Sequence, residues 1–339
     1  MSDPLVIWGA GAIGGTLAAW WTRAGFDVLL VDVVREHVEA CRTTGLAIEG
    51  PIDAFTVGVP ALLPSDVTGR FSRVVLAVKA HHTAEAVAAL APHLDDDGFV
   101  LSAQNGLNET LIAREVGGHR TMGAFVNYGA HWLGPGRVTL GSRGAVVVGE
   151  LDGETRRRTE DMLELLKIFE PAAVLTDNIW GYLWAKLAYG SMLVATALNM
   201  DSMADNFATP ERSVVFRTLG AEVLAVAAAR GVTPVGFDCF DPASFDPGAS
   251  EETSREGLDR LDAFNRNPDK THSGVWRDLA IHKRRTEVDS QIAVVTELAT
   301  EVGVDTPALG RLVELVHDVE AGRRVQSVET FNELMPFCR

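Results

Sequence analysis

The sequence predicts an α/β protein in which a doubly wound sheet is followed by an all-α C-terminal domain. Three observations predict it. Short apolar runs alternate with helical patterns through the first 150 residues, a glycine-rich turn joins the first run to the first helical pattern, and apolar residues at helical spacing dominate after residue 176. A chain of 339 residues is long enough for two ordinary domains. We therefore expect one domain over residues 1–176 and a second over residues 177–339.

The first domain is expected to be a mainly parallel sheet. Its strands are predicted where β-branched, apolar runs occur, at residues 5–9, 27–32, 73–79, 99–106 and 145–150. Several runs are continuously apolar, which is typical of parallel strands covered on both faces. Helical patterns at 14–25 and 81–94 separate them, and the glycine-rich stretch 126–150 is expected to add partly antiparallel strands that close the sheet.

The second domain is expected to be helical. Apolar residues recur at helical spacing over residues 178–199, 212–231, 275–303 and 306–322. The intervening stretch 241–272 is polar and contains proline, so we expect loops with a short helix there.

Composition excludes several classes of function. The formal net charge of −16 disfavours nucleic acid and anionic lipid as partners. Three scattered cysteines predict neither a disulfide framework nor a zinc site, and no metal site is predicted elsewhere. The first residues lack the features of a signal peptide, and no apolar run approaches the ~20 residues of a membrane span. A cytoplasmic protein without a membrane anchor is expected.

The glycine-rich turn has the spacing G-x-G-x-x-G, directly after the first predicted strand and at the start of a helix. In a Rossmann domain the first glycine makes the tight turn, the second lets the backbone approach the pyrophosphate, and the third lets the helix pack on the strand. The helix N-terminus then offers N–H groups to the phosphates. We therefore predict an NAD or NADP site that includes Gly9, Ala10, Gly11, Ala12, Ile13 and Gly14.

Asp32 ends the second predicted strand, 18 residues beyond Gly14. A carboxylate at this point accepts a hydrogen bond from the ribose 2′-hydroxyl and repels a 2′-phosphate, so NAD is favoured over NADP. A helix cap or a turn residue is the alternative role for Asp32. Arg35, three residues on, would partly offset the repulsion.

Several further motifs, in this order, resemble those of the ketopantoate reductases (2-dehydropantoate 2-reductases). They are AVKAHHT, AQNGLNE, LWAKLAYGSMLVATALN, RRTEVD and GVDTPALGRLVELV, and with the glycine turn they span nearly the whole chain. The resemblance implies hydride transfer between a nicotinamide cofactor and the carbonyl carbon of a 2-oxo acid, as in pantothenate biosynthesis. It leaves open whether the chain is a monomer or a homodimer.

The same resemblance assigns site residues. It implies that Lys186 and Glu287 are catalytic, that Lys79 lies at the cofactor, and that Asn105 contacts cofactor or substrate. Ketone reduction needs a proton as well as a hydride, and a lysine ammonium can stabilise the growing alkoxide and protonate it while a carboxylate orients it. From the residues alone, Lys186 is equally well explained as a lysine at a helix edge, and Glu287 as part of a solvated charged face.

Lys79 and Asn105 each end a predicted strand, where an open α/β sheet binds its ligands, although Asn105 before Gly106 is also typical of a simple turn. The adjacent His81 and His82 would point in different directions at a helix start, so we do not expect them to bind a metal together.

The pattern departs from the family around the substrate. Gly190 and Val194, at i+4 and i+8 from Lys186, stand where typical members carry asparagines that hold the substrate. Ser273 is kept, but Gly274 replaces a second serine. We expect Gly190, Val194 and Ser273 to border a wider and more apolar substrate site.

One extra residue also separates Asp278 from Glu287, which leaves the helical register of Glu287 open unless a bulge absorbs it. These departures keep two alternatives open: an NAD-dependent dehydrogenase for a different, bulkier hydroxy acid, and a non-catalytic dinucleotide-binding sensor.

Overall fold

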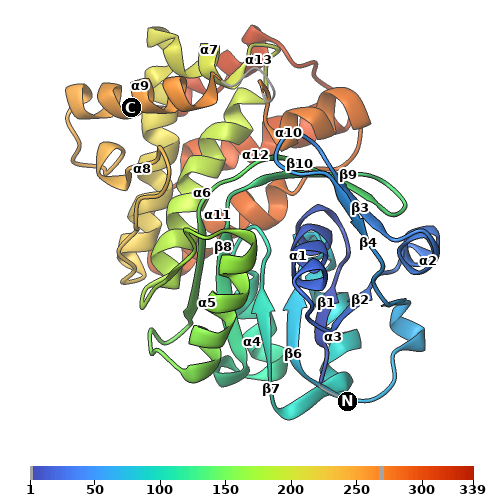
Figure 1. The fold of residues 1–339 in the computed structure, drawn as a ribbon. Coiled ribbons are helices and arrows are strands. Elements are labelled where there is room, and N and C mark those ends of the chain that lie inside the picture. Colours follow the sequence, from blue (N-terminus) through green and yellow to red (C-terminus); the bar gives the residue numbers. More distant parts are fainter. Residues whose placement is uncertain (1–2, 267–270) are drawn as a thin grey trace. The chain divides into compact units, whose positions relative to one another are not determined.

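The computed structural model describes residues 3–266 and 271–339. The chain divides into two compact units, Met1–Ile179 and Trp180–Arg339 (Figure 1). This division lies three residues after the expected boundary at residue 176. Within the described residues no helix is both long and apolar enough to cross a membrane. The three cysteines, all in described positions, are free thiols.

The first unit is built on an eight-stranded sheet with the order β12-β11-β8-β7-β6-β1-β2-β5. Neighbouring strands are parallel except β8 and β11. The predicted α/β fold class, with a Rossmann-like first domain and a helical second one, is confirmed. The strands are β1 (Leu5–Trp8), β2 (Val28–Val31), β5 (Ala61–Leu62), β6 (Phe71–Leu76), β7 (Leu94–Ser102), β8 (Thr121–Val126), β11 (Val146–Glu150) and β12 (Val174–Leu175).

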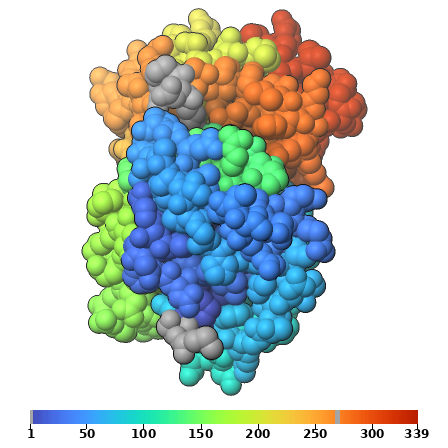
Figure 2. Space-filling model, turned by 45° about the vertical axis from the view of Figure 1, so that its right-hand side comes forward, coloured from blue at the N-terminus to red at the C-terminus, as the bar shows by residue number. Residues whose placement is uncertain are grey.

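Alternate residues of the central strand β1 enter two separate cores, one on each face of the sheet. Leu5 and Ile7 pack into one apolar cluster, and Val6 and Trp8 into the other. Helices cover both clusters: α1 (Ala12–Arg23), α2 (Arg35–Thr43), α3 (Thr83–Leu90), α4 (Asn108–Val116) and α5 (Arg157–Phe169). Figure 2 shows a face of this unit that is formed mainly by the early, blue part of the chain. Burial on both faces explains why β1 is apolar throughout.

A second, four-stranded sheet corrects the expectation for residues 126–150. Only β11 from this stretch joins the main sheet; the rest forms a hairpin that pairs with an earlier hairpin in the order β4-β3-β10-β9. Its strands are β3 (Leu46–Glu49), β4 (Phe55–Val57), β9 (Gly129–Gly134) and β10 (Arg137–Ser142). The physical reason is the alternating burial of β10, in which Val138 and Leu140 are fully buried between more exposed residues. Such a strand suits a sheet with one covered face.

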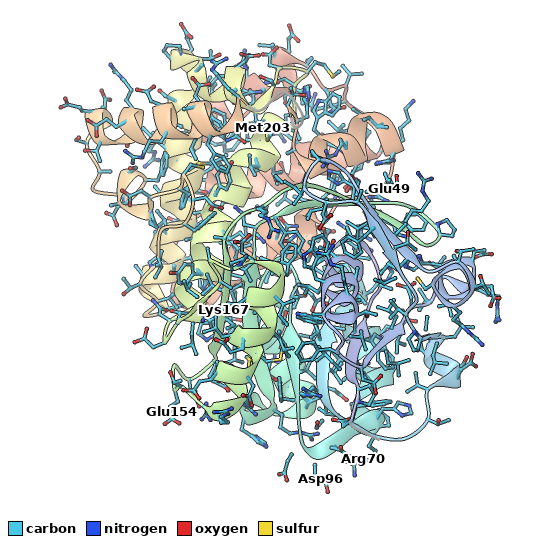
Figure 3. All side chains as sticks on the ribbon, viewed as in Figure 1. Glu49, Arg70, Asp96, Glu154, Lys167 and Met203 are labelled. Carbon is cyan, nitrogen blue, oxygen red and sulfur yellow. The ribbon has the colours of Figure 1, made fainter. Side chains whose placement is uncertain are left out.

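Exposed ion pairs lie at the end of the main sheet where β6 and β7 begin. Arg70 lies 2.6 Å from Asp96, and both side chains are largely in solvent (Figure 3). Pairs of this kind contribute little to stability. The candidate residues of the first unit lie at the opposite end, where the parallel strands finish.

The second unit is helical, as expected. Its helices are α6 (Ile179–Thr196), α7 (Met203–Ala208), α8 (Ser213–Ala229), α9 (Glu251–Asn265), α10 (Gly274–Arg277), α11 (Val294–Val302), α12 (Pro307–Glu320) and α13 (Val328–Asn332). Two π-helical turns, Asp278–His282 and Asp289–Ala293, flank residues 283–288.

Two expectations for the second unit were wrong in part. The stretch 241–272 contains the 15-residue helix α9, which begins where the Ser250 hydroxyl accepts a hydrogen bond from the Thr253 N–H. Residues 267–270 of this stretch lie outside the described residues. The helix expected over 275–303 is interrupted, since Lys283 has a φ of +48° and residues 283–286 are not helical.

Candidate active site

The three glycines of the turn after β1 differ in the space that surrounds them. Gly9 has a φ of +102°, and a Cβ there would lie 2.7 Å from the backbone nitrogen of Val78, just beyond β6. A Cβ on Gly14 would overlap the carbonyl oxygen of Gly9. A Cβ on Gly11, in contrast, would meet no described atom within 4 Å. Gly9 and Gly14 are therefore required by the fold, whereas Gly11 leaves open space at the helix start.

The N-terminus of α1 is suited to an anion. Gly11 is the capping residue and supplies no side-chain hydrogen bond, and the first turn contains no acidic residue. The first N–H groups of a helix have no partner within the helix, and they carry a partial positive charge. The residues present therefore fit the pyrophosphate of a dinucleotide.

Ala10 is held on both sides of its peptide. Its N–H donates to Asp32 Oδ2 over 2.8 Å, and its carbonyl oxygen lies 2.8 Å from His37 Nε2. The Gly136 N–H donates to His37 Nδ1 over 2.8 Å, so Nδ1 is an acceptor and Nε2 carries the proton that it donates to Ala10. His37 is 1% exposed. The glycine turn is thus fixed before any ligand arrives.

Asp32 has a structural role beside its predicted one. Its second oxygen, Oδ1, accepts a hydrogen bond from the Val34 N–H over 2.9 Å, so the carboxylate ties β2 to the glycine turn and to the start of α2. A carboxylate has about four acceptor positions, which leaves capacity for ribose hydroxyls. The turn role and the ribose role are therefore compatible.

Lys79 and Asn105 follow β6 and β7, which are neighbours in the sheet. A polar network fixes the backbone around both of them. Gln104 donates to the Val78 carbonyl oxygen over 2.9 Å and to the Thr83 hydroxyl over 2.8 Å. Asn108 in turn donates to the backbone oxygen of Asn105 over 2.7 Å. Lys79 follows β6, which lies beside β1 where the strand order reverses, and Asn105 follows β7, the next strand in the sheet. Open α/β sheets bind ligands at such strand ends.

The second unit carries the other candidates, beginning with Lys186 on α6. Apart from Trp180 in the first turn, the half-buried residues of this helix are Tyr182, Lys186, Gly190 and Leu193, and the rest of the helix is buried. These positions form one narrow strip at i, i+4, i+8 and i+11. Lys186 is therefore neither in the apolar core nor fully in solvent.

Val194 does not share this strip. Its side chain is 1% exposed and lies in the core. Eight residues at 100° per residue place it about 80° from Lys186, whereas Leu193 returns to within about 20°. The expectation that Val194 borders the substrate site is corrected on this ground.

Glu287 lies between the two π-helical turns and is 9% exposed. A π-turn accommodates one residue more than an α-helical turn. Residues 283–286 between the two π-turns are not helical, so the direction of Glu287 does not follow from helical spacing. The preceding residue is anchored, because both the N–H and the hydroxyl of Thr286 donate to Glu320 Oε1 over 2.7 Å. Ser273 caps α10, where its hydroxyl accepts a hydrogen bond from the Trp276 N–H over 3.2 Å.

His317 bridges the two acids around this segment. Its Nδ1 lies 2.9 Å from Glu320 and its Nε2 lies 2.9 Å from Asp289, which in turn pairs with Arg285. Burial alone would lower the pKa of His317, but its hydrogen bond to Glu320 and the charge of Asp289 outweigh burial and raise it. Protonated His317 therefore helps to hold the segment that carries Glu287.

We expect the variant His317→Gln to lose more stability in acid than in base. Because the folded-state pKa is above the unfolded value of about 6.5, the stabilisation is complete below that pH and disappears as the pH rises through the folded pKa. Thermal unfolding of both proteins at pH 6 and pH 9 measures this, with a larger difference in Tm expected at pH 6. Equal differences at the two pH values would contradict the role of the charge.

Two family models match the chain. The one described as ketopantoate reductase PanE/ApbA matches residues 5–153, and the one described as ketopantoate reductase PanE/ApbA C terminal matches residues 178–320. The chain belongs to the ketopantoate reductase family. The family predicted from the motifs is thereby confirmed.

Curated relatives of this ketopantoate reductase family member match almost end to end at low identity. A 2-dehydropantoate 2-reductase of Streptococcus pyogenes is 23% identical over 94% of this chain and 98% of its own. One from Archaeoglobus fulgidus is 28% identical over 93% and 97%. Identities this low leave the substrate undecided, and the family rests on the two family models.

Solved structures show the same fold. A D-mandelate dehydrogenase with NADH and anilino(oxo)acetate has a TM-score of 0.80 at 23% identity, over 94% of this chain and 99% of its own. A PanE/ApbA family ketopantoate reductase from Ralstonia eutropha has a TM-score of 0.76 at 26% identity, with the same coverage. A dimeric ketopantoate reductase from Staphylococcus aureus has a TM-score of 0.70 at 20% identity, over 95% and 100%.

Within the reductase fold, the sequence patterns missed two supporting residues. Gln104 had a signal, because it stands beside Asn105 in the quoted motif. His37 had none, since it is 27 residues from its partner Ala10 and contacts it only in the folded chain. Among the described residues, no cluster of histidine, cysteine or acidic side chains could hold a metal ion, and His81 and His82 belong to none.

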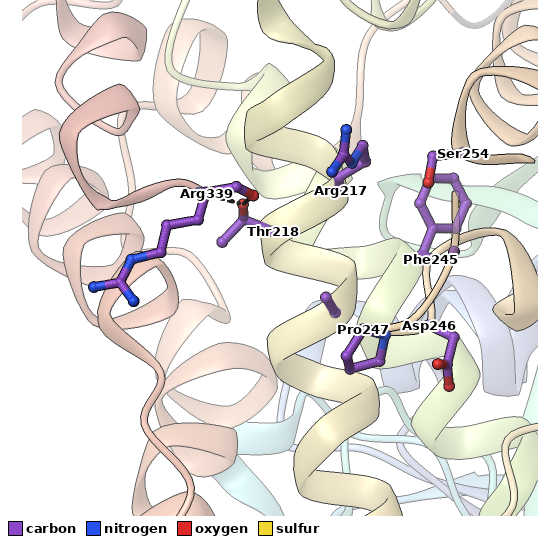
Figure 4. Close-up of a pocket in the computed structure, with 9 residues that line it drawn as sticks. Arg217, Thr218, Phe245, Asp246, Pro247, Ser254 and Arg339 are labelled. Carbon is purple, nitrogen blue, oxygen red and sulfur yellow. Dashed lines mark hydrogen bonds between the residues drawn. The ribbon is translucent and has the colours of Figure 1, made fainter. Parts of the chain in front are cut away.

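A small hollow in the helical unit of this family member is separate from the candidate residues. It measures about 70 Å³ beside α8 and is lined by Arg217, Thr218 and Phe245 among others (Figure 4). The Thr218 hydroxyl there donates to the backbone oxygen of Arg339 over 3.1 Å. Because ligand pockets commonly measure about 300–1,000 Å³, this hollow is too small for a nicotinamide or a substrate.

Proposed function

We propose that this protein is an NAD(P)H-dependent reductase of 2-oxo acids. The proposal depends mainly on the position of Lys186 in a chain of the ketopantoate reductase family. Among the described residues of its helix, Lys186 lies on the only half-buried strip, and the helix is otherwise buried. From this strip Lys186 can present its ammonium group to a ligand while the rest of its helix packs in the apolar core. The glycine turn with open space at Gly11 supports the cofactor half of the proposal.

In the proposed reaction a bound NAD(P)H supplies a hydride to the carbonyl carbon, and the 2-oxo acid becomes a 2-hydroxy acid. Lys186 Nζ donates a proton to the carbonyl oxygen as negative charge develops on it, which balances the reaction. Glu287 orients the ammonium group. Lys79 and Asn105, at the carboxyl ends of β6 and β7, bind the nicotinamide end of the cofactor.

The substrate is either 2-dehydropantoate or a bulkier 2-oxo acid. Gly190 bears on this choice, because a Cβ there would meet just one described atom, the side-chain oxygen of Gln291, at 4.0 Å. Glycine in place of the asparagine of typical members changes which substrate groups this position can bind, and a panel of substrates decides between the two. We propose that initial rates be measured with 2-dehydropantoate, pyruvate, branched 2-oxo acids and phenylglyoxylate. Absence of turnover with all of them would favour the non-catalytic sensor.

We expect NADH to be favoured over NADPH by about tenfold or more in kcat/KM, because the Asp32 carboxylate repels a 2′-phosphate. The variant Asp32→Asn should narrow this ratio. It should also lower Tm, because one amide cannot accept hydrogen bonds from both Ala10 and Val34. Initial rates with each cofactor measure the ratio, and a clear preference of the wild type for NADPH would contradict our reading of Asp32.

A homodimer remains a prediction for this chain. The dimeric relative from Staphylococcus aureus supports testing it. Sedimentation of the full chain at several concentrations separates monomer from dimer.

A further inference from the structure

Gly190 removes a side chain from the strip of α6 that carries Lys186. It lies one turn after Lys186, about 6 Å along the helix axis. Both residues are half-buried, while their helix is otherwise mostly buried. A side chain at residue 190 would therefore project from the same strip of α6 as the lysine, and glycine provides no side chain there.

An amide from another segment reaches this vacancy. Gln291 Oε1 lies 4.0 Å from the point that a Cβ on Gly190 would occupy. Apart from the residues next to Gly190 and the nearby backbone of α6, no other described atom lies within that distance. Gln291 is itself half-buried. The side chain of Gln291 thus borders the space beside Gly190 from a segment other than α6.

The segment of Gln291 also carries Glu287. The Gln291 N–H donates to the Glu287 backbone oxygen over 3.0 Å, so the two residues lie one helical turn apart. Gln291 is in the middle of the π-helical turn Asp289–Ala293, whose wider backbone changes the direction of the side chains in it. Gly190 and Gln291 are therefore each one turn from a proposed catalytic residue.

We propose that Gln291 binds the substrate's carboxylate in this protein, in the space that Gly190 leaves. The inference rests on the proposed function. A glutamine amide has two N–H donors, which suit a carboxylate, and its side chain is one methylene longer than asparagine, so it reaches across from the segment opposite α6. A Cβ on residue 190 would be in ordinary van der Waals contact with Gln291 Oε1, and a longer side chain there would extend into the space that the Gln291 amide borders.

The variant Gln291→Met tests this, because methionine keeps the length and flexibility of the side chain and lacks the donors. We expect the KM for the best 2-oxo acid of the panel to rise about 10- to 100-fold, with kcat within about threefold and the Kd for NADH unchanged. The variant Gln291→Glu should raise KM further, since it places a second negative charge against the carboxylate.

A rescue and a control separate binding from folding. The double variant Gly190→Asn/Gln291→Ala should bind substrate more tightly than Gln291→Ala alone, because the new amide enters from α6 the space that the shorter side chain leaves. The control is Gln326→Met, which removes a hydrogen bond of 2.8 Å to the Ala197 backbone oxygen in the same unit. It should lower Tm and leave KM unchanged.

Oxamate, a 2-oxo acid analogue that is not reduced, gives a readout without turnover. Calorimetric titration in the presence of NADH should show weaker oxamate binding by Gln291→Met than by the wild type. If the wild type turns over a 2-oxo acid or binds oxamate and Gln291→Met does so equally well, the role of Gln291 is wrong while the proposed function stands. If the wild type does neither, the proposed function fails and the inference fails with it.

Discussion

Replacing Lys186 with methionine is expected to lower kcat for 2-oxo acid reduction by about 10²- to 10⁴-fold. The variant loses both the proton donor and the charge that stabilises the developing alkoxide. Methionine fits the half-buried strip of α6, so Tm should change little. Steady-state rates measure the loss, and a fluorescence titration with NADH should give an unchanged Kd.

The matched control for Lys186→Met is Lys167→Met. Lys167 is exposed on α5 and pairs with Glu164 over 2.8 Å (Figure 3). An exposed pair of this kind contributes about 0–1 kcal/mol, and its loss should leave kcat unchanged. If Lys186→Met retained kcat within about threefold, Lys186 would not be the proton donor.

Gly11→Ala and Gly14→Ala are expected to affect different properties, although both replace a glycine of the same turn: the first lowers NADH affinity, and the second lowers stability. A Cβ on Gly14 overlaps the Gly9 carbonyl oxygen, so Gly14→Ala should lower stability by about 1–3 kcal/mol or more and abolish NADH binding. Gly11 has a φ of −69°, which alanine adopts readily, and open space around its Cβ position. Gly11→Ala should therefore fold with an unchanged Tm.

The second glycine variant tests the cofactor site without disturbing the fold. The methyl group of Gly11→Ala would occupy the space in which a pyrophosphate approaches the backbone, so the Kd for NADH should rise at least about tenfold. Thermal unfolding and an NADH titration of both variants decide the matter. A Gly11→Ala variant that binds NADH as tightly as the wild type would place the dinucleotide elsewhere.

Much of the fold could be predicted because the relevant signals are local. β1 and β2 are apolar throughout, and β6 and β7 each contain an apolar run. The burial of these runs on both faces is visible in the sequence as continuous hydrophobicity. The glycine turn was predictable because its spacing meets a steric demand within a few residues. In contrast, β10 pairs with β3, about ninety residues earlier in the chain, and no local pattern predicts that pairing.

The candidate site divides in the same way. Lys186 and Glu287 were recognisable from their motifs, and the motifs suggested Val194 as well. The structure buries Val194 because eight residues do not complete whole helical turns. The π-turns around Glu287 could not be predicted, because a π-turn has no composition of its own and depends on what packs against each face.

Residue spacing alone specified the glycine turn, the alternation of the main strands and helices in the first unit, and the lysine on its apolar helix, since each depends on neighbours along the chain. Tertiary contacts decided that His37 and Asp32 hold Ala10, that His317 links the acids around Glu287, and that Gln291 reaches the gap at Gly190. Apart from His317 and Glu320, which are three residues apart on α12, those partners are from 22 to 101 residues apart along the chain. Hydrogen bonds act over about 3 Å, so only folding brings such groups within range.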